Sequence, residues 1–221
     1  MADHSNLPLS DVKCGYINTF LKGDTILDVG AGKGHYCQWL SRNNKLHLFA
    51  IDLQHPPGLD EAITFFTYNL EEDIPLANEV FDTVLAFDIV EHINQEQNFL
   101  SELFRLCKPG GVLIGSVPHD NDLFLPAYNL TFYHRSDLTH KRYYTPESIK
   151  KAISNAGFID CHVSKEGGVS PQVFAEFFPH RLQWVIKKTI GFLRRCGVIN
   201  TKKLSSDLFF TAKKPSLPDR N

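Results

Sequence analysis

The stretch ILDVGAGKGHYCQWL, residues 26–40, decides the fold. It begins as an apolar β-strand, turns through glycines at positions 30, 32 and 34, and continues with the apolar spacing of an amphipathic helix. Glycine permits positive φ and lets a ligand approach main-chain atoms that a Cβ would shield. A strand–loop–helix corner with three such glycines therefore predicts a seat for a ligand of nucleotide size.

The rest of the chain alternates in the same way. Helical spacing appears at 36–43, 94–107 and 145–158, where Thr145 is the expected cap and Gly157 the stop. Strands that are apolar throughout are typical of a sheet covered on both faces. We therefore predict an α/β fold: a three-layer, doubly wound, Rossmann-like, seven-stranded, mostly parallel sheet with helices on both faces. The expected strands are 25–30, 46–53, 63–70, 81–90, 111–118, 158–167 and 208–214.

Length, charge and cysteine usage limit the class of protein. A chain of 221 residues suits a single domain, 1–221. Lys plus Arg (23) nearly balances Asp plus Glu (25), so no overall field favours nucleic acid. The five cysteines are scattered without a CxxC pair, which indicates reduced thiols. The first residues lack the apolar core of a secretory signal, and the expected compartment is the cytoplasm.

Two segments interrupt the alternation. Residues 119–145 are rich in aromatic side chains and hold three histidines, which predicts a substrate-side lid; the alternative is an excursion that covers a sheet edge. Residues 170–205 form an amphipathic helical insertion before the last strand. It either packs on the sheet or provides a peripheral contact with membranes or lipid-linked substrates through 181–195. Its apolar face holds Leu182, Val185, Ile186, Ile190 and Leu193, and its basic face holds Arg181, Lys188 and Arg195.

Acidic residues around the glycine corner favour an adenosyl ligand that carries an ammonium group. Asp28 precedes the glycines, whose D-x-G-x-G-x-G spacing is shorter than the G-x-G-x-x-G of dinucleotide sites. A carboxylate there suits the ammonium group of S-adenosylmethionine. Asp52 ends the second strand, where it can accept both ribose hydroxyls. Asn69 could meet the adenine amino group and Leu70 its face.

The chain resembles the class I S-adenosylmethionine-dependent methyltransferases, in the group similar to ubiquinone-biosynthesis and glycan-cluster enzymes. The resemblance rests on LDVGAGKG, AIDL, FDTVLAFDIVEHI and LCKPGGVLIGSVP. It implies S-adenosyl-L-methionine as cofactor and S-adenosyl-L-homocysteine as product. The family usually has Asp where Asn69 stands, and both Asp28 and Asn69 have the alternative role of capping their loops. The implied cofactor-binding residues are Asp28, Gly30, Ala31, Gly32, Gly34, Asp52, Leu53, Asn69, Leu70, Phe87 and Asp88.

Histidines are the candidate catalytic residues. Methyl transfer chiefly requires alignment, but a hydroxyl acceptor also needs a base or a metal to take its proton. The candidates are His92 after the fourth strand, His119 after the fifth and His140 in the lid. The run Asp88-x-x-Glu91-His92 resembles the E-x-x-E-H metal ligands of small-RNA 3′-end methyltransferases and of some ubiquinone O-methyltransferases. The alternative is that Glu91 and His92 only start the next helix or line the pocket.

The resemblance implies methyl transfer to an oxygen, or less readily a nitrogen, of a small molecule, a sugar or glycan, or a lipid-linked acceptor. DNA is disfavoured because FDIV stands where DNA amino-methyltransferases carry N/D-P-P-Y, and RNA is a minor alternative. Two rival classes are a non-catalytic S-adenosylmethionine-binding module and an NAD-dependent dehydrogenase. The dehydrogenase would need the longer glycine spacing and, in the short-chain type, a Y-x-x-x-K motif that this sequence lacks.

Overall fold

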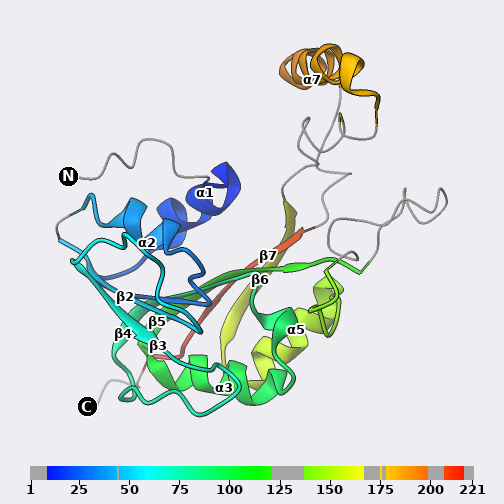
Figure 1. Ribbon diagram of the computed structural model, residues 1–221. Helices are drawn as coiled ribbons and strands as arrows, with labels where there is room; N and C mark the ends of the chain where they lie inside the picture. The colour runs from blue at the N-terminus through cyan, green and yellow to red at the C-terminus, as the bar shows by residue number, and fades with distance from the viewer. Residues whose placement is uncertain are drawn as a thin grey trace.

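A computed structural model describes residues 9–43, 45–120, 137–166, 175, 178–198 and 207–216. Figure 1 shows a central twisted sheet with helices above and below it. Its seven strands have the order β3-β2-β1-β4-β5-β7-β6. They are β1 (Thr25–Val29), β2 (His47–Asp52), β3 (Ile63–Thr67), β4 (Phe81–Phe87), β5 (Cys107–Pro118), β6 (Ile159–Glu166) and β7 (Asp207–Lys213).

The first five strands are parallel, and β7 runs antiparallel to both β5 and β6. This arrangement confirms the predicted mostly parallel, seven-stranded Rossmann-like sheet. The carboxyl ends of β1, β2 and β4 meet at one edge, because the register pairs Asp28 with Ala50 and with Leu85. The motifs LDVGAGKG, AIDL and FDTVLAFDIVEHI, which contain these three strand ends, are therefore brought to one edge by the strand order and register.

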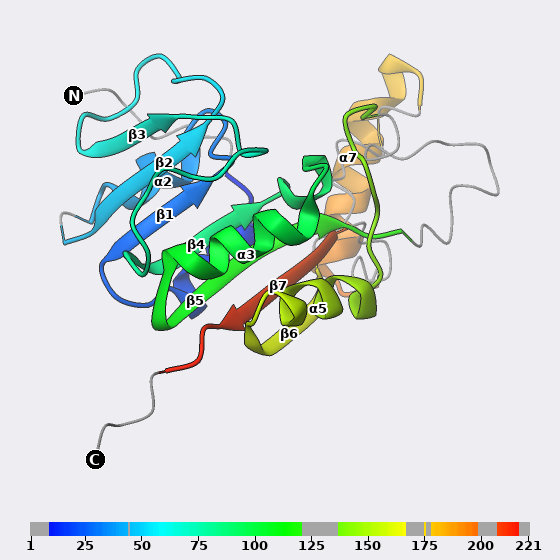
Figure 2. The ribbon, with the colours of Figure 1, turned by 90° about the horizontal axis from the view of Figure 1, so that it is seen from below.

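Helices cover both faces, as expected (Figure 2). On one face lie α1 (Asp11–Phe20) and α2 (His35–Leu40), which bury Ile17, Cys37 and Leu40 in one apolar core. On the other face lie α3 (Glu96–Leu106) and α5 (Pro146–Asn155), whose apolar side chains form a second core. Each fully buried aliphatic or aromatic side chain contributes roughly 1.5–3 kcal/mol, so these two cores hold the layers together.

Several element boundaries differ from the prediction for local reasons. β3 ends at Thr67 rather than 70, because Asn69 Oδ1 accepts a hydrogen bond from Glu71 N (3.1 Å) and turns the chain. β4 ends at Phe87 rather than 90, because Asp88 adopts a φ of 51°. The predicted helix cap is confirmed, since Ser148 N donates to Thr145 Oγ1 at 3.0 Å. Helix α1 was not predicted, because it buries a single apolar side chain, Ile17.

The two interrupting segments have different outcomes. Residues 121–136 of the expected lid, and residues 170–174, 176–177 and 199–205 of the insertion, lie outside the described residues. Residues 137–144 run back along the sheet edge, where Tyr144 N donates to Pro118 O at 3.1 Å. Helix α7 (His180–Arg195) stands away from the sheet in Figure 1, and none of its described side chains is buried. Both interpretations of this helix, packing on the sheet and contact with lipid, therefore stay predictions.

Candidate active site

The glycine corner joins the tips of β1 and β2. Gly30 N and Ala31 N both donate to Ile51 O, at 2.9 and 3.2 Å, and Gly34 N donates to Ala31 O at 2.8 Å. Gly30, Gly32 and Gly34 all have positive φ, between 56° and 72°. A Cβ on Gly30 would lie 2.6 Å from Ile89 Cγ1, so this turn requires glycine for both conformation and space. The predicted tight turn is present, with its amides near the end of β2.

Asp52, at the end of β2, is hydrogen-bonded directly to the glycine corner that follows β1. Its Oδ2 accepts a hydrogen bond from Gly32 N and its Oδ1 accepts one from Leu53 N, both at 2.7 Å. The Leu53 side chain is largely exposed at this edge. A carboxylate fixed by two main-chain amides keeps one orientation, and its remaining lone pairs are free for ribose hydroxyls. Asp52 is thus positioned next to the corner, as the sequence predicted.

Asp28 lies beneath the corner rather than on its surface. It is 2% exposed, and its Oδ2 accepts a long hydrogen bond from the Cys37 thiol (Sγ···Oδ2 3.8 Å). Burial raises the pKa of Asp28 to about 7. When Asp28 is ionised, its negative charge therefore lies beneath the glycine turn and not on the surface. Direct contact of its carboxylate with an ammonium group stays a prediction.

Asn69 and Leu70, the residues of the predicted adenine site, have structural roles in the fold. The Asn69 side chain is engaged locally, because Nδ2 donates to Glu72 Oε1 at 3.2 Å and Oδ1 accepts from Glu71 N. Leu70 is 7% exposed and belongs to the core on the α3 side. The loop-capping role of Asn69 is therefore present, and contact of either residue with adenine stays a prediction.

Lys13 of α1 reaches across to the end of β4. It forms an ion pair with Asp88, whose other carboxylate oxygen accepts a hydrogen bond from Ser116 Oγ. The ammonium group also lies 5.3 Å from the ring centroid of Phe87, which is itself 7% exposed. The sequence reasoning missed Lys13, and the available signal was Ser10, a typical N-cap residue that fixes the start of α1. Lys13 thus places a positive charge beside Asp88 at the carboxyl end of β4.

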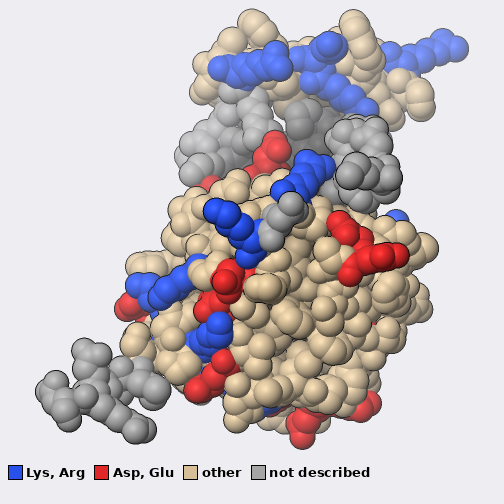
Figure 3. All heavy atoms as spheres, turned by 90° about the vertical axis from the view of Figure 1, so that its left-hand side faces the viewer, with Lys and Arg blue, Asp and Glu red and all other residues tan. Residues whose placement is uncertain are grey.

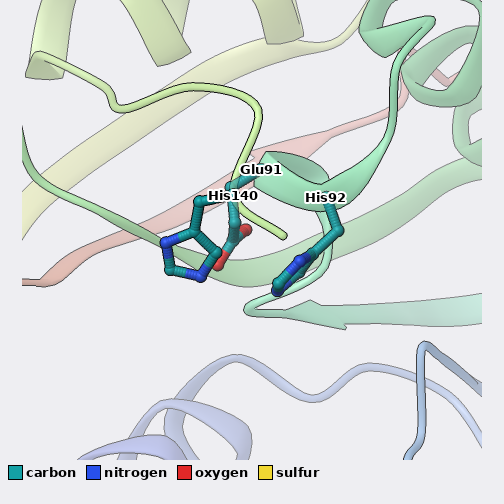
Figure 4. A group of neighbouring side chains, drawn as sticks. All are labelled: Glu91, His92 and His140. Carbon is teal, nitrogen blue, oxygen red and sulfur yellow. The ribbon is translucent and has the colours of Figure 1, made fainter. Parts of the chain in front are cut away.

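Glu91, His92 and His140 form a cluster at the same edge of the sheet. Figure 4 shows the three side chains turned toward one another; Glu91 and His92 come from η1 (Val90–His92) and His140 from the returning segment. Each residue offers one potential metal-ligand atom, and these three atoms lie within 4.8 Å of one another. The centroids of the two imidazole rings are 4.7 Å apart. Burial raises the pKa of Glu91 well above its usual value, and the charge of Asp88 adds to this shift. A carboxyl group and two imidazoles are thus assembled from distant parts of the chain.

The segment 137–144, which we call the strap, holds His140 in place. Lys141 N donates to Glu91 O at 2.8 Å, and the Arg142 guanidinium donates to Ile93 O (2.7 Å) and Asn94 O (2.8 Å). Thr139 Oγ1 lies 2.9 Å from His92 Nδ1, so the strap also fixes the second imidazole. Sequence reasoning identified the histidines but missed Arg142, because its two carbonyl partners follow η1, about fifty positions earlier in the chain.

The other predicted residues lie outside this cluster. His119 follows β5 and pairs through its backbone with Tyr144 at the far end of the strap. Among the described residues, the cluster of potential metal ligands does not include Asp88. The Asp88 carboxylate instead binds Lys13 and Ser116. The structure therefore brings together His92 and His140, with Glu91, and leaves His119 as a separate residue on the same edge.

The cluster fits a divalent cation. One carboxylate oxygen with two imidazole nitrogens is a donor set that several transition metals accept. Glu91 Oε2 is buried and has no hydrogen-bond partner among the described residues. A buried oxygen in that state carries a desolvation penalty that a bound cation would offset. Two residues of the run that resembles a metal-binding motif, Glu91 and His92, thus lie in this cluster together with His140, whereas Asp88 does not.

A methyltransferase relative matches part of this chain in sequence. The mitochondrial ubiquinone biosynthesis O-methyltransferase of Rattus norvegicus is 35% identical over 105 residues, which cover 42% of this chain and 30% of the rat protein. This chain therefore spans less than a third of that relative's length.

Solved structures show the same fold. An S-adenosylmethionine-dependent methyltransferase from Archaeoglobus fulgidus superposes with a TM-score of 0.64 at 21% identity, covering 92% of this chain and 93% of the other. Phosphoethanolamine N-methyltransferase 2 of Haemonchus contortus, solved with S-adenosyl-L-methionine, gives 0.61 at 18% identity over 93% and 53%. The family described as a methyltransferase domain matches residues 12–163, so the chain belongs to the class I S-adenosylmethionine-dependent methyltransferases.

Proposed function

We propose that this chain methylates an oxygen of a small-molecule, sugar or lipid-linked acceptor, with His140 as the base that takes the acceptor proton. The observation that carries the proposal is the cluster of Glu91, His92 and His140 at the sheet edge that also holds the glycine corner and Asp52. An amine acceptor can lose its proton to solvent after transfer, whereas a hydroxyl gains most from a positioned base. The two imidazoles, His140 on the strap and His92 held by Thr139, therefore favour a hydroxyl acceptor over an amine.

The residues divide the work between binding and proton transfer. S-Adenosylmethionine supplies the electrophilic methyl group when it is bound. The glycine corner and Asp52 would hold its adenosyl part, and main-chain rigidity there would fix the direction of attack. His140 would accept the hydroxyl proton, and Asp137 Oδ2, 3.7 Å from its Nε2, would stabilise the resulting imidazolium. Thr139 would keep His92 oriented toward the same point.

The test is methyl transfer from labelled S-adenosylmethionine to matched pairs of acceptors. Each pair compares a hydroxyl compound with its amine analogue, among phenols and quinols, sugars and lipid-linked glycans. We expect label in the hydroxyl member. Faster methylation of the amine would contradict the proposed acceptor atom. Cofactor binding without transfer to any acceptor would favour a non-catalytic binding module.

His140→Ala tests the assigned base. Loss of a positioned base should reduce kcat by about 10²–10⁴-fold, while the affinity for S-adenosylmethionine stays unchanged. His162→Ala is a matched control, because His162 is exposed on β6, outside the cluster. Turnover by His140→Ala at the rate of the control would remove His140 from the chemistry.

A bound cation is the alternative use of the same three side chains. Glu91, His92 and His140 would hold it, and it would act as a Lewis acid that lowers the pKa of an acceptor hydroxyl. Elemental analysis of the purified protein, followed by chelation and readdition of divalent metals, separates the two roles. Activity that is lost on chelation and restored by a metal would assign His140 as a ligand. Activity that survives complete metal removal supports the role of His140 as the base.

A further inference from the structure

Helix α7 carries a strong positive charge within a nearly neutral chain. Between Phe178 and Val198 the sequence has five Lys or Arg residues and no Asp or Glu, whereas the whole chain has a net charge of −2. Arg181, Lys188 and Arg195 recur every seven residues, which places them in one row along the helix. The row is about 21 Å long. Figure 3 shows Lys and Arg side chains spread along this helix at the top of the view.

The same helix and the residues that flank it expose a concentration of apolar side chains. Six of the ten large apolar side chains that are exposed among the described residues lie between Phe178 and Val198: Phe178, Leu182, Trp184, Val185, Phe192 and Val198. Leu182, Val185 and Phe192 lie on one side of the basic row, and each is about half exposed or more. Exposed apolar groups at this density mark an interaction surface.

The polar groups beside this apolar side are already satisfied. Thr189 lies between Leu182 and Val185 around the helix, and its Oγ1 donates to Val185 O at 2.9 Å. Trp184 lies on the other side of the basic row, with Lys188 Nζ 5.9 Å from its ring centroid. Tryptophan next to lysine is typical of helices that lie at the level of lipid headgroups. The face can therefore enter an apolar medium without burying a free hydroxyl donor.

Charge and shape favour a lipid surface over the other occupants of such a face. A second copy of α7 would bring five basic residues against five with no acidic partner. RNA would use the basic row but would leave Leu182 and Val185 in water. An anionic bilayer satisfies both halves of the face, since headgroup phosphates pair with the basic row and acyl chains cover the apolar side.

We propose that α7 is a peripheral membrane anchor that lies in the surface of an anionic bilayer, with Leu182, Val185 and Phe192 inserted and Arg181, Lys188 and Arg195 at the headgroups. The helix has 16 residues, and no helix in the described ranges is long and apolar enough to cross a membrane. Contact is therefore along the surface. This inference does not depend on the acceptor or on the base proposed above.

Flotation of the full chain with vesicles tests the anchor. We expect partitioning onto phosphatidylcholine vesicles that contain phosphatidylglycerol, and little onto phosphatidylcholine alone. Arg181→Glu combined with Lys188→Glu should reduce partitioning at least about tenfold. Val185→Ser combined with Phe192→Ser should also reduce it, because the inserted apolar area is lost. Lys150→Glu combined with Lys151→Glu makes the same charge change at two exposed residues of another helix, α5, and should leave binding near the wild-type level.

Tryptophan fluorescence provides a second readout at the helix itself. The chain has two tryptophans, so a Trp39→Phe background leaves Trp184 as the reporter. We expect its emission to shift to the blue when anionic vesicles are added. Unchanged S-adenosylmethionine affinity in every variant shows that the domain is folded. The proposal is overturned by equal binding to neutral and anionic vesicles, by equal binding of the α7 and α5 variants, or by RNA binding or self-association through α7 without vesicle binding.

Discussion

Asp52 shows how one side chain organises the proposed cofactor site. Its carboxylate already bridges Gly32 N and Leu53 N, so the orientation that ribose hydroxyls would need is set before binding. Asp52→Ala should weaken S-adenosylmethionine binding by roughly 1–3 kcal/mol, through the lost hydroxyl contacts and a looser corner. Titration calorimetry measures this change. Asp52→Asn keeps one acceptor oxygen and should lose less; unchanged affinity in the alanine variant would reject the ribose assignment.

Asp28 links residue burial to the pH dependence of stability. Its pKa is raised by burial from 3.8 to about 7, so the folded state binds this proton more tightly than the unfolded state. The resulting stabilisation is full below about pH 4 and is lost as the pH rises through about 7. Asp28→Asn removes the titration. The free energy of unfolding of the variant, relative to wild type, should therefore rise by roughly 4 kcal/mol from acidic to mildly alkaline pH.

Urea unfolding across that pH range measures the Asp28 effect. Asp24→Asn is the matched control, because Asp24 lies just before β1 and is exposed. The difference between the Asp28 variant and wild type should change steadily between about pH 4 and about pH 7 and level off above that. A difference that is constant with pH would contradict the buried, proton-holding role of Asp28.

At the scale of elements, the strap depends on one guanidinium group. Arg142 ties the strap to the end of η1 through Ile93 O and Asn94 O, and the strap carries His140. Arg142→Ala should lower turnover by about tenfold or more, because small displacements of a catalytic group are costly. The affinity for S-adenosylmethionine should not change, since the glycine corner is on separate elements. Steady-state kinetics together with calorimetry check both parts.

Arg105→Ala is the control for that prediction. Arg105 makes the same kind of contact, donating to Leu76 O (2.7 Å) and Ile74 O (2.8 Å), but it joins α3 to a loop at another part of the molecule. Both variants should lose comparable stability in thermal unfolding, whereas only Arg142→Ala should lose turnover. Equal loss of turnover in the two variants would show that destabilisation alone explains the effect.

At the scale of the whole molecule, the strand order can be tested at Gly115. This residue lies in β5 opposite Phe210 of β7, and a Cβ on it would lie 2.3 Å from Ala86 O and 2.4 Å from Phe210 Cζ. Ala86 and Phe210 lie next to Gly115 only because β5 is placed between β4 and β7. Gly115→Ala should therefore destabilise the fold by about 1–3 kcal/mol or more, measured by chemical unfolding.

Gly15→Ala is the control for the test at Gly115. Gly15 lies in α1, and a Cβ on it has no heavy atom within 4 Å. Its substitution should be neutral or stabilise by up to about 1 kcal/mol, because alanine favours helix. A Gly115 variant as stable as the Gly15 variant would contradict the close packing of the β4, β5 and β7 backbones.

The sequence by itself determined the sheet and the family. Glycines at every second position after an apolar strand have few alternative structures, since positive φ and close packing exclude other residues. Asp52 was placed correctly for the same reason: it ends a strand, and neighbouring parallel strands end at one edge. The glycine spacing and the ends of apolar strands are local features, so they can be recognised from the pattern of residues along the sequence.

Only the tertiary structure decided which distant side chains meet. Lys13 reaches Asp88, and Arg142 holds His140 beside Glu91 and His92, across separations that no local pattern encodes. It also decided that Asp28 is buried beneath its corner and that Leu182, Val185 and Phe192 of α7 are exposed. Burial and long-range contact arise from how whole elements pack, so they are fixed by the assembled molecule and not by the spacing of residues along the chain.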